Sequence, residues 1–362
     1  MKITGKHVLV ISPEPWKGVQ ISKHVVARAL AAQGNTVCFW DPPDPAESGL
    51  RLERDPSGVE LVRYHHWFRG VNRFPRAVRD RYYGRLIRRI EALTGRPFDL
   101  IWCFDNTRMQ EFPPGHATRV LHLVDFDTLH NGQGLIRTAD LVLTVSEAIT
   151  AHARTVHPGV NVHLIGHGLD ERWLDAARVD RVPNVPPRTA VYAGLLATDY
   201  VDWEMFSAVV LRHPEVHFDL YGPYEADYPA EGFQAIRNAP NTTLHGLVPK
   251  ERLMPAAHAA DILVYCYRAY SLDQKVATSH KVLEYLSTGN VVVGSYQQTL
   301  ADQAQLLLMA QEREGFIPAF DRACAEHAAL NAPALREARI AFARSRTMPV
   351  LLDRIGDLLP TP

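Results

Sequence analysis

The chain contains few cysteines, and none are spaced as metal ligands. Only four of its 362 residues are cysteines, namely Cys38, Cys103, Cys266 and Cys324. They lie far apart and form no C-x-x-C pair, which argues against a structural zinc site and a disulfide framework. We therefore expect reduced thiols in a cytoplasmic protein. The 17 histidines show no H-E-x-x-H or related spacing, so no metal ion is expected.

The sequence also lacks long apolar runs and an excess of charge of either sign. Its N-terminus, MKITGKHVLVISP, has too short an apolar run for a signal peptide, and no stretch approaches the roughly 18–20 residues of a membrane span. The formal net charge is −1, so nucleic acid is not an expected partner. A globular composition and 362 residues indicate a soluble protein of two domains.

The first half of the chain alternates predicted strands with predicted helices. A helix is expected over Ile21–Gln33, ended by Gly34, and another begins with Ser146 as its N-cap. Such alternation predicts a parallel sheet covered by helices. The short apolar runs that indicate buried strands are His7–Ser12, Thr36–Trp40, Leu100–Phe104, Val120–Val124, Leu141–Val145 and Val162–Ile165.

A proline-rich stretch, Arg178–Thr189, interrupts this pattern and indicates a connector between domains, which we place at 173–185. The alternation then restarts, so the sequence predicts doubly wound domains over 1–172 and 186–340. A ligand is expected at the carboxyl ends of their strands, in a cleft between the domains. The strands expected in the second half are Thr189–Tyr192, Val216–Tyr221, Thr242–His245, Ile262–Tyr265 and Val291–Gly294, and the helical segments are Trp203–Arg212, Ala256–Ala260, Lys281–Thr288 and Pro333–Leu359.

The most specific segment is HKVLEYLSTGNVVVG, His280–Gly294. Lys281 and Glu284 are three residues apart and share one face of a predicted helix. A lysine in a first helical turn suits a diphosphate, because free backbone N–H groups already favour an anion there. Glu284 could accept hydrogen bonds from a ribose diol. The alternative is a surface ion pair between the two residues, which would stabilise the helix by about 0.2–0.5 kcal/mol.

This segment resembles the K-x-x-E-Y-L-x-x-G-x-V-V-V motif of glycosyltransferases with the GT-B fold, which have two Rossmann-like domains facing a cleft. The resemblance covers the C-terminal half well and the N-terminal half in outline. It implies transfer from a nucleoside-diphosphate sugar without a cofactor or metal ion, and a C-terminal helix, about 341–362, that returns to the first domain. The other similar blocks are LIGHGLD (Leu164–Asp170), VYAGLL (Val191–Leu196), DWEMF (Asp202–Phe206), HPEVHFDLYGP (His213–Pro223) and Thr242–Arg268.

The resemblance also implies which residues bind the donor. Glu284 matches the residue that binds the ribose, Lys281 matches one near the diphosphate, and His280 precedes them. Gly194 follows the first strand of the donor domain, where close approach of backbone to phosphate leaves no room for a Cβ. Arg268, at the end of a predicted strand, could add charge opposite the diphosphate or lie on the rim.

One departure from the family concerns stereochemistry. Retaining members of family 4 place a second glutamate seven residues before the one matched here, and this sequence has Ala277 there, with Asp273 nearby. An inverting enzyme with a base in the N-terminal domain, as in polysaccharide glucuronosyltransferases, is the alternative. We expect that base to be Asp125 or, second, Asp127, which follow a predicted buried strand. The alternative for both aspartates is that they cap a loop or the start of a helix. Their D-x-D spelling also occurs as a metal-binding motif in the GT-A fold, but a GT-A chain would not contain the C-terminal blocks described above.

Further residues at the predicted cleft are Asp105, after the strand LIWCF, and the loop residues Trp16, Lys17 and Gly18. These are candidates for contact with the acceptor. We expect a structural role for His24 on the following helix.

The stretch Trp67–Ile90 is basic and aromatic, with eight arginines against one acid, Asp80. It could lie on the anionic inner face of a membrane, which would suit a lipid-linked acceptor. The alternative is a solvated helix whose aromatic side faces the core, and nucleic-acid binding is not expected.

Taken with the resemblance, these features predict a hexosyl- or glycuronosyltransferase acting on a lipid-linked or polysaccharide glycan of the cell surface. Two alternatives are a sugar-nucleotide epimerase of the same fold, which needs no acceptor, and a catalytically silent module that only binds nucleotide sugar.

Overall fold

The computed structural model describes residues 2–65, 70–125, 132–175, 181–268 and 279–360. The chain divides into two compact units, Met1–Gly168 with Met348–Pro362, and Leu169–Thr347. This division differs from the predicted linker at 173–185, because Trp173 is buried in the core of the second unit. Arg181 and Asn184 also donate hydrogen bonds to Asp261 of that unit, at 3.0 Å each. The described part of the predicted connector therefore packs as part of the second unit.

The first unit is built on an eight-stranded sheet in the order β3-β4-β2-β1-β5-β6-β7-β8. All neighbouring strands pair in parallel except β3 and β4, which are antiparallel. These two strands were not predicted, because RLER and ELVR begin and end with charged residues and form no long apolar run. Strand β3 lies at the edge of the sheet, and β4 lies between β3 and β2. The strands are β1 (His7–Ile11), β2 (Thr36–Trp40), β3 (Arg51–Arg54), β4 (Glu60–Arg63), β5 (Leu100–Cys103), β6 (Thr118–Leu123), β7 (Leu141–Thr144) and β8 (Val162–Leu164).

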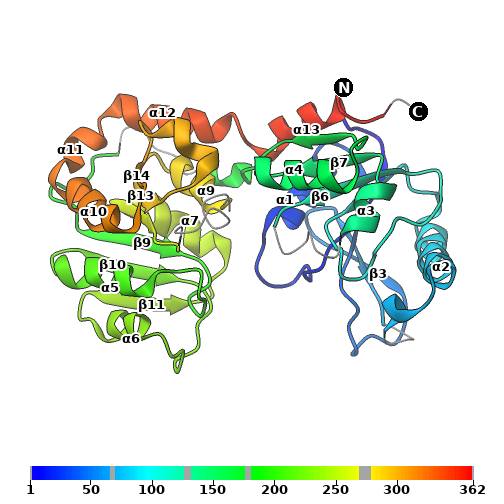
Figure 1. Cartoon of the computed structure of the whole chain (residues 1–362), viewed down its shortest axis with the longest axis horizontal. Coiled ribbons are helices and arrows are strands. Elements are labelled where there is room, and N and C mark those ends of the chain that lie inside the picture. The colour runs from blue at the N-terminus through cyan, green and yellow to red at the C-terminus, as the bar shows by residue number, and fades with distance from the viewer. Residues whose placement is uncertain (1, 66–69, 126–131, 176–180, 269–278, 361–362) are drawn as a thin grey trace. The chain divides into compact units, whose positions relative to one another are not determined.

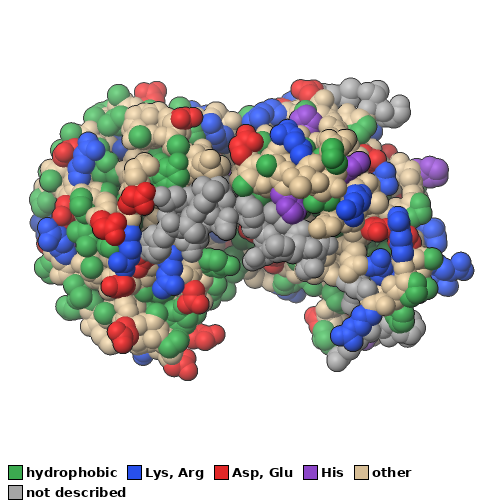
Figure 2. All heavy atoms as spheres, in the orientation of Figure 1, with side chains coloured by type: hydrophobic (Ala, Val, Ile, Leu, Met, Phe, Trp, Pro, Cys, Tyr) green, Lys and Arg blue, Asp and Glu red, His purple; other side chains and the backbone are tan. Residues whose placement is uncertain are grey.

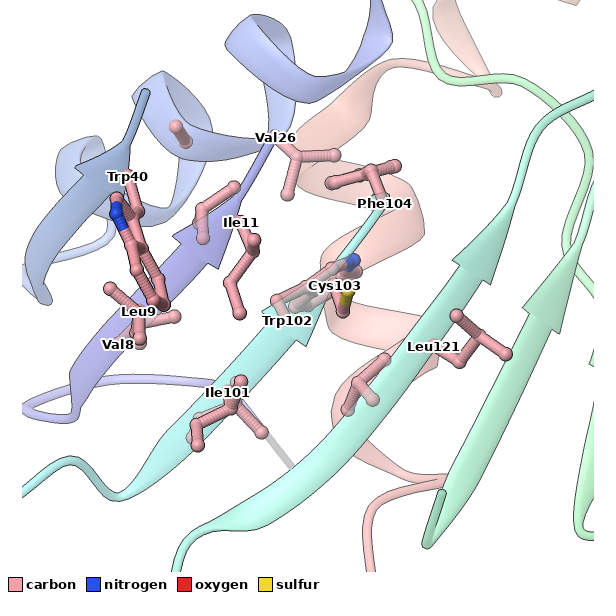
Figure 3. Packing of buried hydrophobic residues seen from close by; sticks show 14 of the residues in the cluster. Val8, Leu9, Ile11, Val26, Trp40, Ile101, Trp102, Cys103, Phe104 and Leu121 are labelled. Atoms are coloured by element: carbon pink, nitrogen blue, oxygen red, sulfur yellow. The ribbon is translucent and has the colours of Figure 1, made fainter. Parts of the chain in front are cut away.

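The helices of the first unit pack on the apolar strands. Figure 3 shows Val26 of the first helix against side chains of β1 and β5, with Trp40 and Trp102 filling the core. The predicted N-cap is confirmed, since Ser146 Oγ accepts a hydrogen bond from Ile149 N at 3.3 Å. The last helix belongs to this unit, because its apolar residues, Met348 and Ile355 among them, lie in the same core. The helices are α1 (Ser22–Ala32), α2 (Arg76–Thr94), α3 (Gln133–Thr138), α4 (Glu147–Val156) and α13 (Met348–Gly356).

The second unit has a six-stranded, all-parallel sheet in the order β11-β10-β9-β12-β13-β14. The chain builds outward from β9 on one side, then returns to build on the other, so the switch point lies between β9 and β12. In open parallel sheets, ligands bind at the carboxyl ends of the strands beside such a point. The strands are β9 (Thr189–Ala193), β10 (His217–Tyr221), β11 (Thr242–Gly246), β12 (Ile262–Tyr265), β13 (Val291–Ser295) and β14 (Leu308–Ala310).

Helices cover both faces of this second sheet, and each face has its own core. Central strands such as β12 and β13 are therefore buried on both sides, which explains their continuous apolar sequences. The helices are α5 (Trp203–Arg212), α6 (Glu231–Asn238), α7 (Lys250–Ala259), α9 (Lys281–Ser287), α10 (Phe316–Ala325), α11 (His327–Leu330) and α12 (Pro333–Arg344).

Within the described ranges, no helix is both long enough and apolar enough to span a membrane. In the same ranges no group of three or more histidine, cysteine or acidic side chains is arranged to bind a metal ion. Three of the four cysteines are buried and all four are unpaired.

Candidate functional site

Three glycines meet where β9, β10 and β11 end. Gly194 N donates to Tyr221 O and Gly222 N donates to Gly246 O, both at 2.8 Å. A Cβ on Gly222, whose φ is +145°, would lie 1.7 Å from Gly194 O. The backbones that follow β9 and β10 therefore come together, on the β9 side of the switch point, in a way that only glycine permits.

Lys281 lies directly over this glycine bend. A Cβ on Gly194 would be 2.1 Å from Lys281 Nζ and 2.8 Å from Tyr192 Oη. The ammonium donates to Tyr267 Oη at 2.5 Å and lies 5.1 Å from the ring centroids of both tyrosines. No carboxylate of a described residue pairs with it. Hydroxyl and ring contacts hold the side chain without neutralising its charge, so the ammonium can still attract an anion.

Helix α9 is held in place by Tyr285, which lies one turn beyond Lys281 and directly contacts β9. Its hydroxyl accepts a hydrogen bond from Ala193 N at 2.8 Å. Burial raises the pKa of Tyr285 well above its ordinary value, which keeps it a neutral phenol. This bond fixes the start of α9 against the end of β9 and so determines where Lys281 points.

Glu284 pairs with Lys250 and not with Lys281. Its Oε1 lies 3.1 Å from Lys250 Nζ, and the two side chains are only 9% and 13% exposed. The predicted surface ion pair between Lys281 and Glu284 is therefore absent, and the two residues have different partners. Lys250, at the start of α7, is a site residue that the sequence analysis missed, although the GLVPK sequence after β11 lies within a block that resembles the family.

The other predicted donor residues lie at the edge of this arrangement. Arg268 is exposed, and its backbone N donates to Tyr200 O at 2.8 Å; within the described structure its side chain does not pair with Glu284. His280 is the N-cap of α9, and its carbonyl accepts from Leu283 N at 3.1 Å. Ala277 and Asp273, which bear on the missing glutamate, lie outside the described residues.

In the first unit, Asp105 is an internal anchor. It is fully buried, and its carboxylate accepts hydrogen bonds from Thr107 Oγ1 at 2.6 Å and from Arg108 Nε at 2.5 Å. Arg108 in turn donates to the carbonyls of Ser12 and Asp41, at 2.5 and 2.6 Å. Burial alone would raise the pKa of Asp105, but the Arg108 guanidinium and these hydrogen bonds hold it below its usual value. Asp105 therefore ties together the loops that follow β1, β2 and β5.

The predicted acceptor loop is anchored to the same network. Trp16 is buried, and its backbone N donates to Asp41 Oδ1 at 2.9 Å. Lys17 is exposed with its Nζ 3.8 Å from Glu53, and Gly18 has a φ of +128°. His24 is buried, with Nε2 3.0 Å from Pro15 O, and burial lowers its pKa to about 4. A structural role for His24 fits these contacts.

Of the two candidate bases, Asp125 and Asp127, the structure describes only the first. Asp125 follows β6 and is exposed at the carboxyl edge of the first sheet. Asp127 lies outside the described residues. Asp125 is thus exposed, whereas the carboxylate of Asp105 is buried.

Neither a protein-family model nor a curated protein sequence matches the chain. Solved structures match it over nearly its whole length. The sucrose-phosphate synthase of Thermosynechococcus elongatus has 17% identity and a TM-score of 0.69, with 98% of each chain covered. A glycosyltransferase from Rickettsia africae has 11% identity and a TM-score of 0.70, covering 98% of this chain and 97% of its own. HepE of Anabaena, in complex with UDP and glucose, has 13% identity and a TM-score of 0.67, covering 97% and 98%.

These similarities extend through both parallel-sheet units and cover more than nine-tenths of each chain. At such low identity they establish the architecture. The chain therefore has the GT-B fold, with two Rossmann-like units.

Proposed function

We propose that this chain is a glycosyltransferase whose second unit binds a nucleoside-diphosphate sugar. The observation that carries the proposal is the ammonium of Lys281, which lies over Gly194 at the switch point and is held by tyrosines instead of a carboxylate. A diphosphate is a strong anion, and an ammonium that no described carboxylate neutralises is a favourable partner for it. Structures of similar fold include one in complex with UDP and glucose, which supports this donor class.

In this proposal Glu284 accepts hydrogen bonds from the ribose hydroxyls. Lys250 provides the countercharge that a largely buried carboxylate needs. Arg268 and His280 are assigned to the rim of the same donor site.

The proposed acceptor is a hydroxyl of a lipid-linked or polysaccharide glycan, and the sugar transferred is a hexosyl or glycuronosyl residue. In an inverting reaction Asp125 removes the proton as the acceptor oxygen forms its bond to the anomeric carbon. The bond from that carbon to the diphosphate breaks, and the leaving oxygen keeps the electron pair. Lys281 stabilises the negative charge that develops there.

A thermal-shift screen against UDP, GDP, ADP and their sugars tests the donor site. A ligand present at about 100 times its Kd stabilises the native state by about 2.7 kcal/mol, so one nucleotide should raise Tm clearly. Glu284→Gln should reduce that shift, because the amide is a poorer acceptor for ribose hydroxyls and also loses the Lys250 pair. Glu251→Gln, an exposed neighbour of Lys250 on α7, is the matched control and should behave as wild type. The absence of a shift with any nucleotide at several times ordinary cellular concentrations would contradict the proposal.

Asp125→Asn tests the base. Transfer should fall about 10²- to 10⁴-fold, while the nucleotide-induced shift should persist because the donor residues belong to the second unit. Asp127→Asn is measured in parallel, and unchanged rates in both variants would rule out either residue as the base. Product analysis of the donor incubated alone separates a transferase from an epimerase, which would convert the sugar nucleotide without an acceptor.

A further inference from the structure

One face of α2 carries cations that the donor site does not use. Val78, Arg81, Arg85 and Arg88 recur at spacings of three and four residues, so they line one side of the helix, with Arg89 beside them. All five side chains are exposed. We call these five residues the basic face of α2, and Figure 2 shows Lys and Arg side chains gathered over this helix.

The charge of the basic face is not neutralised within the described structure. No described carboxylate pairs with Arg81, Arg85, Arg88 or Arg89. The acids of α2 are engaged elsewhere, since Asp80 lies 3.7 Å from Arg76 and Glu91 accepts from Phe98 N at 2.9 Å. Arg76 also pairs with Glu111. The basic face is therefore a row of four exposed cations.

Exposed apolar side chains lie at the start of the same helix. Phe74 is 44% exposed and Val78 is 49% exposed. By contrast Tyr83 is buried together with Leu86, Ile87 and Ile90, and Tyr82 packs edge-on against Tyr83 at 5.2 Å. The side of α2 that carries Tyr83 thus faces the core, whereas the arginines with Phe74 and Val78 are exposed.

We propose that the basic face of α2, with Phe74, docks on an anionic lipid bilayer. Basic residues close to a membrane surface are attracted by its negative potential, and apolar side chains beside them can enter the headgroup region. The apolar side of α2 is occupied by the protein core, so the helix binds from outside and does not insert. A polynucleotide would also attract arginines, but it gives no reason for exposed Phe and Val at the end of the row. Docking is independent of the proposed donor site, which lies in the other unit.

Co-sedimentation of the full chain with phosphatidylcholine vesicles, with and without phosphatidylglycerol, tests the proposal. Binding should require the anionic lipid and weaken at about 1 M salt, where the Debye length is about 3 Å. Arg81→Glu with Arg85→Glu should lower the partition coefficient at least about tenfold, given the usual contribution of each basic residue near a membrane. Phe74→Ser with Val78→Ser should lower it by a smaller factor with little change in salt dependence. Lys2→Glu with Lys6→Glu changes the charge equally at exposed sites outside α2 and serves as the control.

Three outcomes would overturn the proposal. One is equal binding to neutral and anionic vesicles, and another is wild-type binding by the arginine double variant. The third is a single-stranded or duplex oligonucleotide that displaces the protein from vesicles and binds more tightly than they do, which would assign the face to nucleic acid. The Tm and nucleotide-induced shift of each variant show whether it is folded, so loss of docking is distinguished from loss of the donor site.

Discussion

Replacing Lys281 with methionine is expected to lower kcat/KM for the donor about 100- to 1,000-fold, the usual effect of removing a donor that stabilises developing negative charge. Methionine keeps much of the side-chain volume between Tyr192 and Tyr267 and removes the ammonium. The loss should therefore appear in affinity for the nucleoside diphosphate and not in affinity for the nucleoside alone. Release of diphosphate from the donor and calorimetric titration with both ligands measure these quantities.

Two further variants isolate the cause. Gly194→Ala keeps the Lys281 ammonium but would place a Cβ only 2.1 Å from its present Nζ position. The lysine must then move, so this variant should also weaken diphosphate binding. Lys250→Met removes a cation from the same region, but one committed to Glu284, and its effect should extend to the nucleoside. If Lys281→Met weakened nucleoside and nucleotide equally, or neither, the diphosphate role would be wrong.

Asp105→Asn is expected to destabilise the protein by about 3–5 kcal/mol, the cost of leaving a buried guanidinium without its charge partner. Arg108 is buried and donates to the carbonyls that follow β1 and β2, so it cannot move to solvent without releasing both loops. Urea unfolding followed by tryptophan fluorescence measures the change. Activity of the folded variant should fall far less than that of Asp125→Asn, because the Asp105 carboxylate has no free position for a substrate.

The pH dependence of this effect has a defined sign. The pKa of Asp105 is lowered in the folded state, mainly by Arg108 acting against the opposing effect of burial. Its contribution to stability is therefore complete above the unfolded pKa of about 3.9 and is lost as the pH falls through the folded value. The difference in unfolding free energy between wild type and Asp105→Asn should be constant near neutral pH and shrink below about pH 4. Asp302→Asn, at an exposed position, should show no such difference, and a constant gap down to acid pH would contradict the ion-pair account.

The strands were largely predictable from the order of residues, because the neighbouring strands of both sheets are parallel except β3 and β4. A strand buried on both sides needs a continuous apolar run, and the predicted bounds of β2 and β12 match those in the structure. The edge strand β3 and its neighbour β4 escaped prediction because their sequences, RLER and ELVR, contain no such run. The start of α7 was placed too late, since Pro255 suggests a boundary, whereas the helix begins at Lys250 and continues through it. Because the predicted helix began at Ala256, Lys250 was not recognised as a candidate partner of Glu284.

The chain order alone indicated the alternating α/β plan, because periodicity is encoded in neighbouring residues. The resemblance to GT-B glycosyltransferases singled out Lys281, Glu284 and Gly194. The sequence did not indicate that Lys281 contacts Tyr192 and Tyr267. Nor did it indicate the ion pairs of Glu284 with Lys250 and of Asp105 with Arg108. These pairings bring together groups from separate strands and helices, and several candidate partners satisfy the same local pattern. Only the packing of the strand ends selects which charge is neutralised inside the protein and which remains available to a ligand.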